Sequence, residues 1–306
     1  MKSEHMTGMQ QYKILVVDND ECVCRLLCDL FKSQGYNVGK AHSVNEALEQ
    51  TGLFIPDMVI SEITLPDMDG FQLTSILKER FPAIKCILMT NCDIDQYLSL
   101  IRHYNVGNIV IKGFEYSLGE LRDYVNTLIH GNIFGLQKYF PGHEIQQVRV
   151  TRYAETKDIC SVICNHFNNK KRVYLEMAID ELVSNAVFHG VFQLTHIPRE
   201  LWKDDLVISN EESVIVSWAR DDQKIGIAVE DPKGTLKKND VLKWIDATYK
   251  RDFGEHGRGF LLVRKLIDRL IINIDPGKKT ECIIIQYVNS NVLNTKKPLM
   301  IHEFNT

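Results

Sequence analysis

The strongest constraint on the fold lies in the first 130 residues, where short apolar runs alternate with helical patterns. Alternation of this kind predicts right-handed crossovers and one parallel sheet with helices on both faces. The apolar runs predict strands over 13–17, 37–41, 58–61, 86–89 and 108–111. Helical patterns follow them up to 33 and over 44–52, 71–80, 94–104 and 117–129. We therefore predict an α/β fold in which residues 12–130 form a five-stranded, doubly wound parallel sheet.

The second half of the chain has a different pattern. Residues 131–144 are rich in glycine and predict a linker between domains. Residues 145–288 combine helices with paired β-rich runs, which predicts a layered α/β sandwich. The expected helices cover 156–168, 172–189 and 258–270, and the expected strands cover 213–219, 224–230, 270–275 and 281–287. Residues 289–306 look like a polar tail.

Composition limits the classes of function. The formal net charge is −4 and the hydrophobic fraction is 44%, as in globular proteins. This balance argues against nucleic acid as a partner. No apolar run approaches the ~18 residues of a membrane span, and the start lacks a signal-peptide pattern. We expect a cytoplasmic protein without a membrane partner. Its eight cysteines are then reduced thiols, and a cysteine metal site is the weaker interpretation.

Polar residues follow four of the predicted strands in the first domain. They are Asp18, Glu62, Thr90 and Lys112. Strand ends of a parallel sheet meet at one edge, so we expect these side chains in one crevice. Carboxylate oxygens are ligands for Mg²⁺, and an ammonium or hydroxyl group contacts phosphate oxygens.

The segments VVDND, ISEITLPDMDG, LMT and VIKGF carry a resemblance to the receiver domain of bacterial response regulators, a flavodoxin-like fold. The resemblance implies that Glu62 replaces the phosphate-accepting aspartate and that Asn19 replaces one acid of an acidic pair. Thr90 would be the switch residue, and Lys112 would contact phosphate. Asp18 is then the remaining candidate for Mg²⁺. Three alternatives stay open. The domain is permanently on-like, with Glu62 as a mimic of an aspartyl phosphate, or it is a decayed receiver kept for docking, or it is still phosphorylated.

A second candidate site begins in the pattern YLEMAIDELVSNAVFHG. Glu181, Asn185 and His189 are each four residues apart and form a polar stripe beside an apolar helix face. Asparagine can ligate Mg²⁺ without repelling phosphates, and a glutamate one turn away can accept a proton. By itself, this stripe is also consistent with a solvated helix face.

Two further segments favour a nucleotide site. Asp231 ends a predicted strand before a turn at Gly234, and a buried aspartate there can accept a hydrogen bond from an exocyclic amine. Gly254, Gly257 and Gly259 directly precede a helix, where backbone N–H groups can approach phosphates.

Together, ELVSNAVFHG, VEDPKG and GEHGRGFLLV resemble the Bergerat-type ATP-binding domain, closest to the anti-sigma-factor serine kinase branch. The resemblance implies ATP and Mg²⁺ as cofactors, Glu181 as general base, Asn185 as the Mg²⁺ ligand and Asp231 as the adenine reader. His189 and the glycines at 234, 254, 257 and 259 would line the nucleotide. Arg258 is either a phosphate contact or an exposed arginine. Lys233 and Thr235 depart from the usual glycines of the first box.

Two functions follow from these patterns. The first is a signalling switch, in which a serine/threonine kinase or sequestering regulator is controlled by a pseudo-receiver. The second is a non-catalytic interaction scaffold whose nucleotide pocket only sets conformation. The resemblance implies a protein partner, such as a sigma factor or an anti-anti-sigma protein, and suggests a homodimer. The irregular segment 191–211 is either a partner surface or packs on its own domain.

Overall fold

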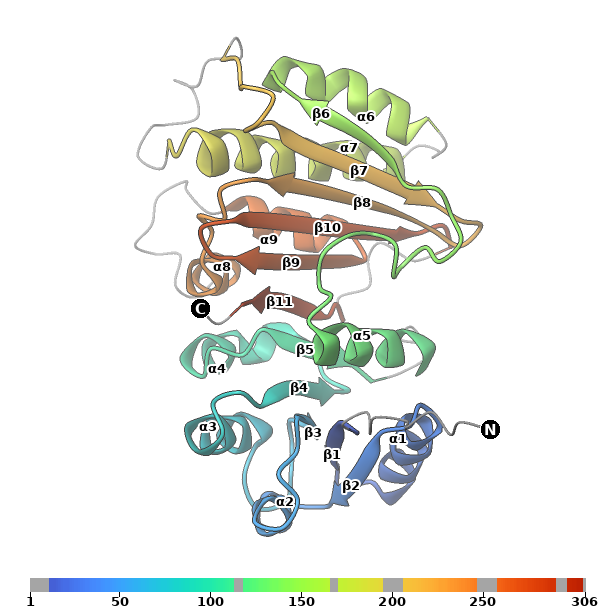
Figure 1. Cartoon of the computed structure of the whole chain (residues 1–306), viewed down its shortest axis with the longest axis vertical. Coiled ribbons are helices and arrows are strands. Elements are labelled where there is room, and N and C mark those ends of the chain that lie inside the picture. Colours follow the sequence, from blue (N-terminus) through green and yellow to red (C-terminus); the bar gives the residue numbers. More distant parts are fainter. Residues whose placement is uncertain are drawn as a thin grey trace, which may run out of the picture. The chain divides into compact units, whose positions relative to one another are not determined.

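The structure, a computed structural model, describes residues 11–112, 118–165, 170–194, 206–246, 258–289 and 296–304 (Figure 1). The chain divides into two compact units. Unit 1 comprises Met1–Asn91 and Ile109–Asn132, and unit 2 comprises Cys92–Asn108 and Ile133–Thr306. The segment Cys92–Asn108 therefore belongs to unit 2, although residues of unit 1 precede and follow it in the chain.

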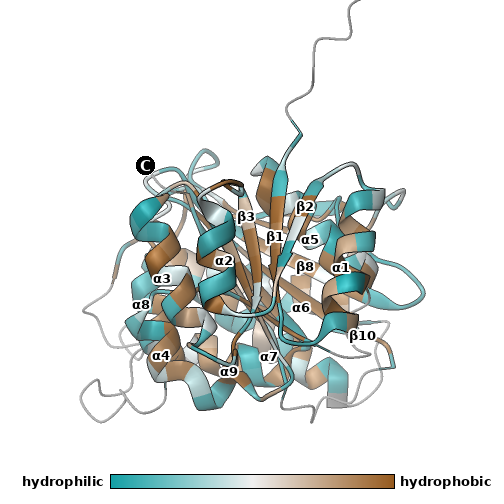
Figure 2. Ribbon diagram, turned by 90° about the horizontal axis from the view of Figure 1, so that it is seen from below, coloured by the Kyte–Doolittle hydropathy of each residue, from teal (hydrophilic) through white to brown (hydrophobic). Residues whose placement is uncertain are grey.

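Unit 1 contains the predicted parallel sheet. Its strands run in the order β2-β1-β3-β4-β5, and each neighbouring pair is parallel. Figure 2 shows α1 and α5 on one side of these strands and α2 and α3 on the other. The strands are β1 (Lys13–Val17), β2 (Asn37–Ala41), β3 (Met58–Glu62), β4 (Lys85–Thr90) and β5 (Asn108–Ile111). The helices are α1 (Glu21–Ser33), α2 (Val44–Thr51), α3 (Gly70–Arg80) and α5 (Leu118–His130). The doubly wound fold predicted for this region is confirmed.

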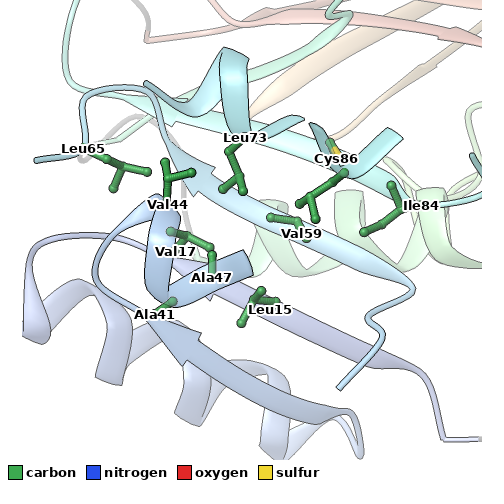
Figure 3. Close-up of a cluster of buried hydrophobic side chains, with 11 residues drawn as sticks. Leu15, Val17, Ala41, Val44, Ala47, Val59, Leu65, Leu73, Ile84 and Cys86 are labelled. Atoms are coloured by element: carbon green, nitrogen blue, oxygen red, sulfur yellow. The ribbon is translucent and has the colours of Figure 1, made fainter. Parts of the chain in front are cut away.

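The core of unit 1 forms because alternate strand residues point to the same side of the sheet. Leu15 and Val17 of β1 and Val59 of β3 meet Ala47 of α2 and Leu73 of α3 there (Figure 3). Both faces of the sheet are covered by helices, so a shift by one residue would exchange the side chains that pack against α2 and α3 with those that face α1 and α5. The shapes of the two apolar faces therefore fix the register of the strands. The polar residues at the strand ends are thereby held at one edge.

Unit 2 contains a mixed sheet with the strand order β11-β9-β10-β8-β7-β6. All neighbours are antiparallel except β11 and β9, which are parallel. Helix α7 packs on β8 and contacts both α6 and α9. The strands are β6 (Gln146–Val150), β7 (Val214–Arg220), β8 (Lys224–Asp231), β9 (Arg269–Asp275), β10 (Lys279–Tyr287) and β11 (Leu299–Glu303). The helices are α4 (Leu98–His103), α6 (Thr156–Cys164), α7 (Lys170–Ser184), α8 (Lys238–Ile245) and α9 (Arg258–Leu266).

Three elements differ from the sequence predictions. The helix expected over 172–189 ends as α-helix at Ser184 and continues as a π-helix, η3 (Asn185–Val191). The helix expected over 94–104 is divided into the 3-10 turn η1 (Ile94–Tyr97) and α4. Helix α8 lies where the sequence indicated only a loop-rich segment. The π-helix follows from i→i+5 hydrogen bonding, which the spacing of apolar residues does not reveal.

The ends of unit 2 also differ from expectation. The residues expected to be a polar tail include β11, whose Leu299, Met300 and Ile301 are buried. The expected linker is likewise ordered against unit 2: we call Ile133–Gly142 the connector, and its Ile133, Leu136 and Phe140 are buried. Both corrections have one cause, namely a few apolar residues that cover a sheet despite polar neighbours.

The segment Cys92–Asn108 is attached to the rest of unit 2 by polar contacts. Arg264 pairs with Asp95 at 2.5 Å, and Arg102 pairs with the fully buried Asp246 at 3.4 Å. Lys238 also donates through Nζ to the carbonyl oxygen of Asn105 at 2.6 Å. These contacts explain why the segment clusters with unit 2.

Of the segment 191–211, residues 195–205 lie outside the described part. At its far end, Ile208 is buried and its N–H donates to the carbonyl oxygen of Thr151 at 2.8 Å. This end packs on its own unit, as one of the two predicted alternatives required. Within the described part of the chain, every helix is too short or too polar to cross a bilayer.

Candidate functional site

The polar residues at the strand ends of unit 1 lie together in one cluster, which we call the pocket of unit 1. Asp18 follows β1 and is fully buried, Glu62 ends β3 and is 6% exposed, and Thr90 ends β4 and is buried. Lys112 follows β5, and its backbone N–H donates to the carbonyl oxygen of Thr90 at 2.8 Å. Asn19 is exposed, unlike the other four.

Lys112 bridges the two buried carboxylates. Its ammonium group lies 2.5 Å from Asp18 Oδ2 and also pairs with Glu62 Oε2. Burial acts to lower the pKa of Lys112, but the hydrogen bonds to Asp18 and Glu62 outweigh it and raise that pKa above its usual value. Lys112 therefore stays charged and compensates the carboxylates.

The remaining carboxylate oxygens also have partners within the chain. Asp18 Oδ1 accepts from the N–H of Asp20 at 3.0 Å. Glu62 Oε1 accepts from the N–H groups of Ile63 and Thr64 at 2.8 and 3.3 Å. All four oxygens are thus engaged by one ammonium and three backbone donors. A divalent cation needs such oxygens as ligands, so this arrangement does not fit one.

The longer side chain of Glu62 makes this geometry available. Its extra methylene moves the carboxylate by roughly one bond of ~1.5 Å relative to an aspartate. Oε1 accepts a hydrogen bond from the backbone N–H of Ile63 directly after β3, while Oε2 pairs with Lys112. Gly70 lies close by, because a Cβ there would approach the carbonyl oxygen of Glu62. The start of α3 and the end of β3 are therefore in tight contact.

In unit 2 the structure places the candidate nucleotide residues on four elements. Glu181 lies in α7, Asn185 and His189 lie in η3, Asp231 ends β8, and Gly259 lies in the first turn of α9. Glu181, Asn185 and His189 are all partly exposed. Asn185 and His189 thus lie in a π-helix, where the sequence predicted a continuous α-helix.

Two close approaches bring these elements together. A Cβ on Gly259 would overlap the carboxylate of Glu181, so α7 and the start of α9 touch at this point. A Cβ on Gly190 would lie 2.9 Å from Cγ of Asp231, so η3 touches the end of β8. Gly190 was not singled out from the sequence. The only available signal was its place at the end of the HG pair that closes the helical pattern.

Asp231 is held by the turn that follows β8. Its Oδ1 accepts from the N–H groups of Lys233 and Gly234 at 3.0 and 3.2 Å. Gly234 has φ +59°, and a Cβ there would collide with the carbonyl oxygen of Asp275. Burial raises the pKa of Asp231, and the two amide hydrogen bonds oppose this rise. The turn thus presents a buried carboxylate at the strand end.

Three of the candidate residues are not placed by these contacts. Gly254 and Gly257 lie outside the described residues. Arg258 begins α9, and its side chain is likewise outside the described part.

Comparison with known proteins bears on the first unit. Residues 14–126 match the family model of the response regulator receiver domain. Transcriptional regulatory protein ZraR of Escherichia coli strain K12 is 39% identical over 77 residues, which are 25% of this chain and 18% of that protein. The DNA-binding transcriptional activator DevR/DosR of Mycobacterium tuberculosis is 34% identical over 34% of this chain and 50% of its own length. The chain thus spans half or less of either relative.

Solved structures are similar over about two fifths of the chain. A two-component response regulator from Clostridium difficile has 24% sequence identity and a TM-score of 0.37, and the match covers 41% of this chain and 100% of that one. A CheY-like receiver domain protein from Methanospirillum hungatei has 19% identity and a TM-score of 0.38 over 40% of this chain and 98% of its own.

Proposed function

We propose that this chain, whose residues 14–126 form a response regulator receiver domain, is a signalling regulator with a pseudo-receiver and an ATP- and Mg²⁺-binding unit. A receiver domain makes the chain part of a signal-transduction system. The second unit is proposed to act on a protein partner as a serine/threonine kinase of the anti-sigma type, or to sequester that partner. The proposal for the second unit rests on two close contacts, one between α7 and α9 and one between η3 and β8.

The pseudo-receiver rests on the pocket of unit 1. Lys112 already pairs with Asp18 and Glu62 and offsets one of their two negative charges, and backbone donors engage the remaining oxygens. A phosphoryl group would need a free acceptor and a metal to neutralise it, and the pocket supplies neither readily. We therefore propose a domain that does not switch by phosphorylation.

A phosphodonor tests this part of the proposal. The wild-type chain is incubated with acetyl phosphate and Mg²⁺ and analysed by intact mass, beside a variant with Glu62→Asp and Asn19→Asp. The wild type is expected to gain no phosphoryl group and to show no Mg²⁺-dependent change in melting temperature. A phosphorylated wild type would overturn the pseudo-receiver. The variant shortens the acidic side chain at position 62, adds a carboxylate at position 19 and serves as the responsive comparison.

Support for the nucleotide unit comes from the placement of its donors and acceptors. Asp231 offers a buried carboxylate whose two described amide bonds both use Oδ1. Glu181 lies against Gly259 in the first turn of α9, where backbone N–H groups are unpaired within the helix. A carboxylate, an amide and a helix start gathered on neighbouring elements suit a nucleotide and its phosphates.

Each of these residues has a proposed task. Asn185 would hold Mg²⁺, which when bound neutralises phosphate charge. Asp231 would accept a hydrogen bond from the adenine amine, and His189 would line the nucleotide. Glu181 would accept the proton from a partner's serine or threonine hydroxyl. In the present arrangement the carboxylate of Glu181 touches α9, so access of that hydroxyl requires the start of α9 to move aside.

The scaffold remains the alternative function. The first glycine box keeps Gly234 but has Lys233 and Thr235 beside it. Lys233 pairs with Glu212 rather than leaving the turn open. A first box with a single glycine would favour a unit that binds a partner without turnover.

Calorimetric titration decides between these functions. Mg-ATP is titrated into the full chain, into Asn185→Ala and into Asn45→Ala, an exposed asparagine of α2 that serves as the matched control. Binding in the micromolar range that Asn185→Ala loses and Asn45→Ala keeps is expected. Absence of binding to the folded wild type would overturn the ATP unit and leave the scaffold.

A protein partner is proposed in preference to DNA. The formal net charge of −4 does not favour a polyanion. Two of the similar proteins are named as DNA-binding regulators, DevR/DosR and NtrC of Proteus hauseri, but they are matched over 50% and 19% of their lengths. Gel-shift measurement with mixed-sequence duplex DNA at 150 mM salt checks this choice, and binding there would argue against it.

A further inference from the structure

Gly190 and Asp231 are in closer contact than any side chain at position 190 would allow. A Cβ built on Gly190 would lie 2.9 Å from Cγ, 3.0 Å from Cβ and 3.2 Å from Oδ1 of Asp231. Carbon atoms in ordinary contact lie about 3.5–4.0 Å apart. Both residues are buried, with Asp231 only 6% exposed, so neither can move into solvent to relieve the overlap.

The π-helix explains why the backbone reaches Asp231 at this point. Phe192 donates to the carbonyl oxygen of Val187 at 3.0 Å, which is an i→i+5 hydrogen bond. The wider turn moves the main chain around Gly190 toward the end of β8. Single π-turns within α-helices are frequent at functional sites. Here the turn places a residue without a side chain against a buried carboxylate.

The carboxylate of Asp231 is thereby confined from two sides. On one side Oδ1 accepts from the N–H groups of Lys233 and Gly234. On the other side the bare Cα of Gly190 faces Cγ and Oδ1. Neither amide hydrogen bond uses Oδ2 of Asp231. The side-chain torsion angles that keep both bonds to Oδ1 therefore also fix the direction of Oδ2.

We propose that Gly190 is the positioning residue that aims Oδ2 of Asp231 at the exocyclic amine of an adenine base. This inference rests on the proposed function and deepens it, because it names the feature that selects the base. An amine donates a hydrogen bond to Oδ2. Hypoxanthine carries a carbonyl oxygen in its place, so two acceptors would face each other and the buried carboxylate would lose its partner.

Paired titrations of Mg-ATP and Mg-ITP test the selection. The wild type is expected to bind ATP at least about tenfold more tightly than ITP, which corresponds to about 1.4 kcal/mol. Gly190→Ala displaces the carboxylate, so ATP affinity should fall about tenfold while ITP affinity changes little. Gly52→Ala is the matched control, because Gly52 has an ordinary φ and its added Cβ would meet only Glu49 O, at 3.3 Å. It should leave the ATP/ITP ratio unchanged.

A double-mutant cycle on stability tests the contact between Gly190 and Asp231 without any nucleotide. Melting temperatures are measured for the wild type, Gly190→Ala, Asp231→Ala and the double variant. Asp231→Ala removes Cγ and Oδ1, two of the three atoms that the new methyl group would meet, and keeps Cβ at 3.0 Å. Gly190→Ala should therefore lower the melting temperature much less in the Asp231→Ala background than in the wild type. This measurement also covers the case in which Gly190→Ala is too unstable for titration.

The outcomes distinguish three conclusions. Additive losses in the stability cycle would overturn the contact between Gly190 and Asp231. If the cycle is non-additive but Gly190→Ala leaves ATP affinity unchanged, the positioning role of Gly190 is overturned and the ATP unit stays intact. A wild type that binds neither nucleotide would overturn the proposed function, and the base selection with it, whatever the cycle shows.

Discussion

At the residue scale, the charge of Lys112 determines whether unit 1 tolerates two buried carboxylates in one pocket. Lys112 is 14% exposed, and its partners Asp18 and Glu62 are nearly inaccessible. Removing one partner of a buried ion pair leaves uncompensated charge, which costs far more than loss of a surface pair.

We expect Lys112→Met to lower the free energy of unfolding by about 3–5 kcal/mol, because two buried carboxylates then lack a cation. Lys40→Met is the control, since Lys40 pairs with Glu21 at the surface, where solvent screens the charges, and its loss should cost much less. Urea unfolding at pH 7 measures both. Adding Glu62→Gln to Lys112→Met should restore part of the loss. Equal effects of the two lysine substitutions would contradict the buried network.

His302 gives unit 2 a defined dependence on pH. Its Nδ1 lies 2.7 Å from Oδ1 of Asn273, whose Nδ2 donates to Glu281 Oε2 at 3.0 Å. Oδ1 of Asn273 is therefore the acceptor, and Nδ1 of His302 carries the hydrogen. Burial, with smaller contributions from Lys138 and Lys238, lowers the pKa of His302 to about 3. The folded chain thus keeps this imidazole neutral.

The sign of the effect follows from the unfolded chain, whose histidine takes up a proton near pH 6.5. Between pH 6.5 and about 3 the unfolded state binds one proton more than the folded state. The free energy of unfolding should therefore decrease as the pH is lowered below 6.5, by up to about 1.4 kcal/mol per pH unit. Denaturation curves from pH 7 to 4.5 should be flatter for His302→Gln than for the wild type. His143→Gln, at an exposed position, should keep the wild-type slope.

At the element scale, the connector is fixed by backbone contacts that a flexible linker would not make. Both carboxylate oxygens of Glu281 accept from the N–H of Gly135, at 2.9 and 3.0 Å. Lys138 donates to the carbonyl oxygens of Phe134 and Gly135 at 2.8 and 3.0 Å. Phe140 is fully buried and lies against Gly226. These contacts protect the peptide bond after Lys138.

We expect Glu281→Ala to make the chain more sensitive to trypsin at Lys138. The substitution leaves the N–H of Gly135 and Nδ2 of Asn273 without this acceptor, which favours local opening of the connector. Initial cleavage rates followed by mass spectrometry should rise about tenfold. Glu230→Gln is the matched control, because Glu230 makes a partly exposed pair with Lys279. Equal rates for wild type and Glu281→Ala would mean that Glu281 does not hold the connector.

Sequence patterns predicted strands better than helix details, and the reason is physical. The buried strands of unit 1 appear as continuous apolar runs, which few other structures produce. The change to a π-helix at Asn185 concerns hydrogen bonds one residue longer, and apolar spacing in NAVFHG is compatible with either helix. Leu299–Ile301 is an apolar run of only three residues and follows lysines and a proline, so β11 had too short a signal.

The candidate sites show the same limit. The strand-end rule placed Asp18, Glu62, Thr90 and Lys112 together correctly, because parallel strands share one edge. That Lys112 engages both carboxylates depends on side-chain lengths and directions, which no linear pattern contains. Gly190 was missed for a similar reason: its role depends on a residue 41 positions later in the sequence.

At the scale of the whole molecule, the two units are interleaved along the chain. Unit 1 is interrupted by Cys92–Asn108, which belongs to unit 2. Arg102 of this segment pairs with Asp246, and Lys238 contacts Asn105. A cut between the units at residue 132 therefore does not separate them cleanly.

A fragment of residues 1–132 should be less stable than unit 1 in the full chain. It retains Cys92–Asn108 but lacks α8, so α4, which carries the buried Leu98 and Ile101, loses the helix on which it packs. Dye binding to exposed apolar surface and hydrogen exchange of 92–108 measure the effect. Both should increase relative to the full chain. A fragment with native-like protection over 92–108 would show that this segment needs nothing from the rest of unit 2.

The interleaving also sets an order of events during synthesis. Ribosomes add about 5–20 residues per second, and the chain from α4 to the end of α9 is more than 150 residues long. The nascent segment 92–108 is thus made on the order of ten seconds before its partners exist. During that interval the segment lacks its packing partner α8 and its ion-pair partners Asp246 and Arg264. Folding of unit 2 is therefore complete only after β11 has been synthesised.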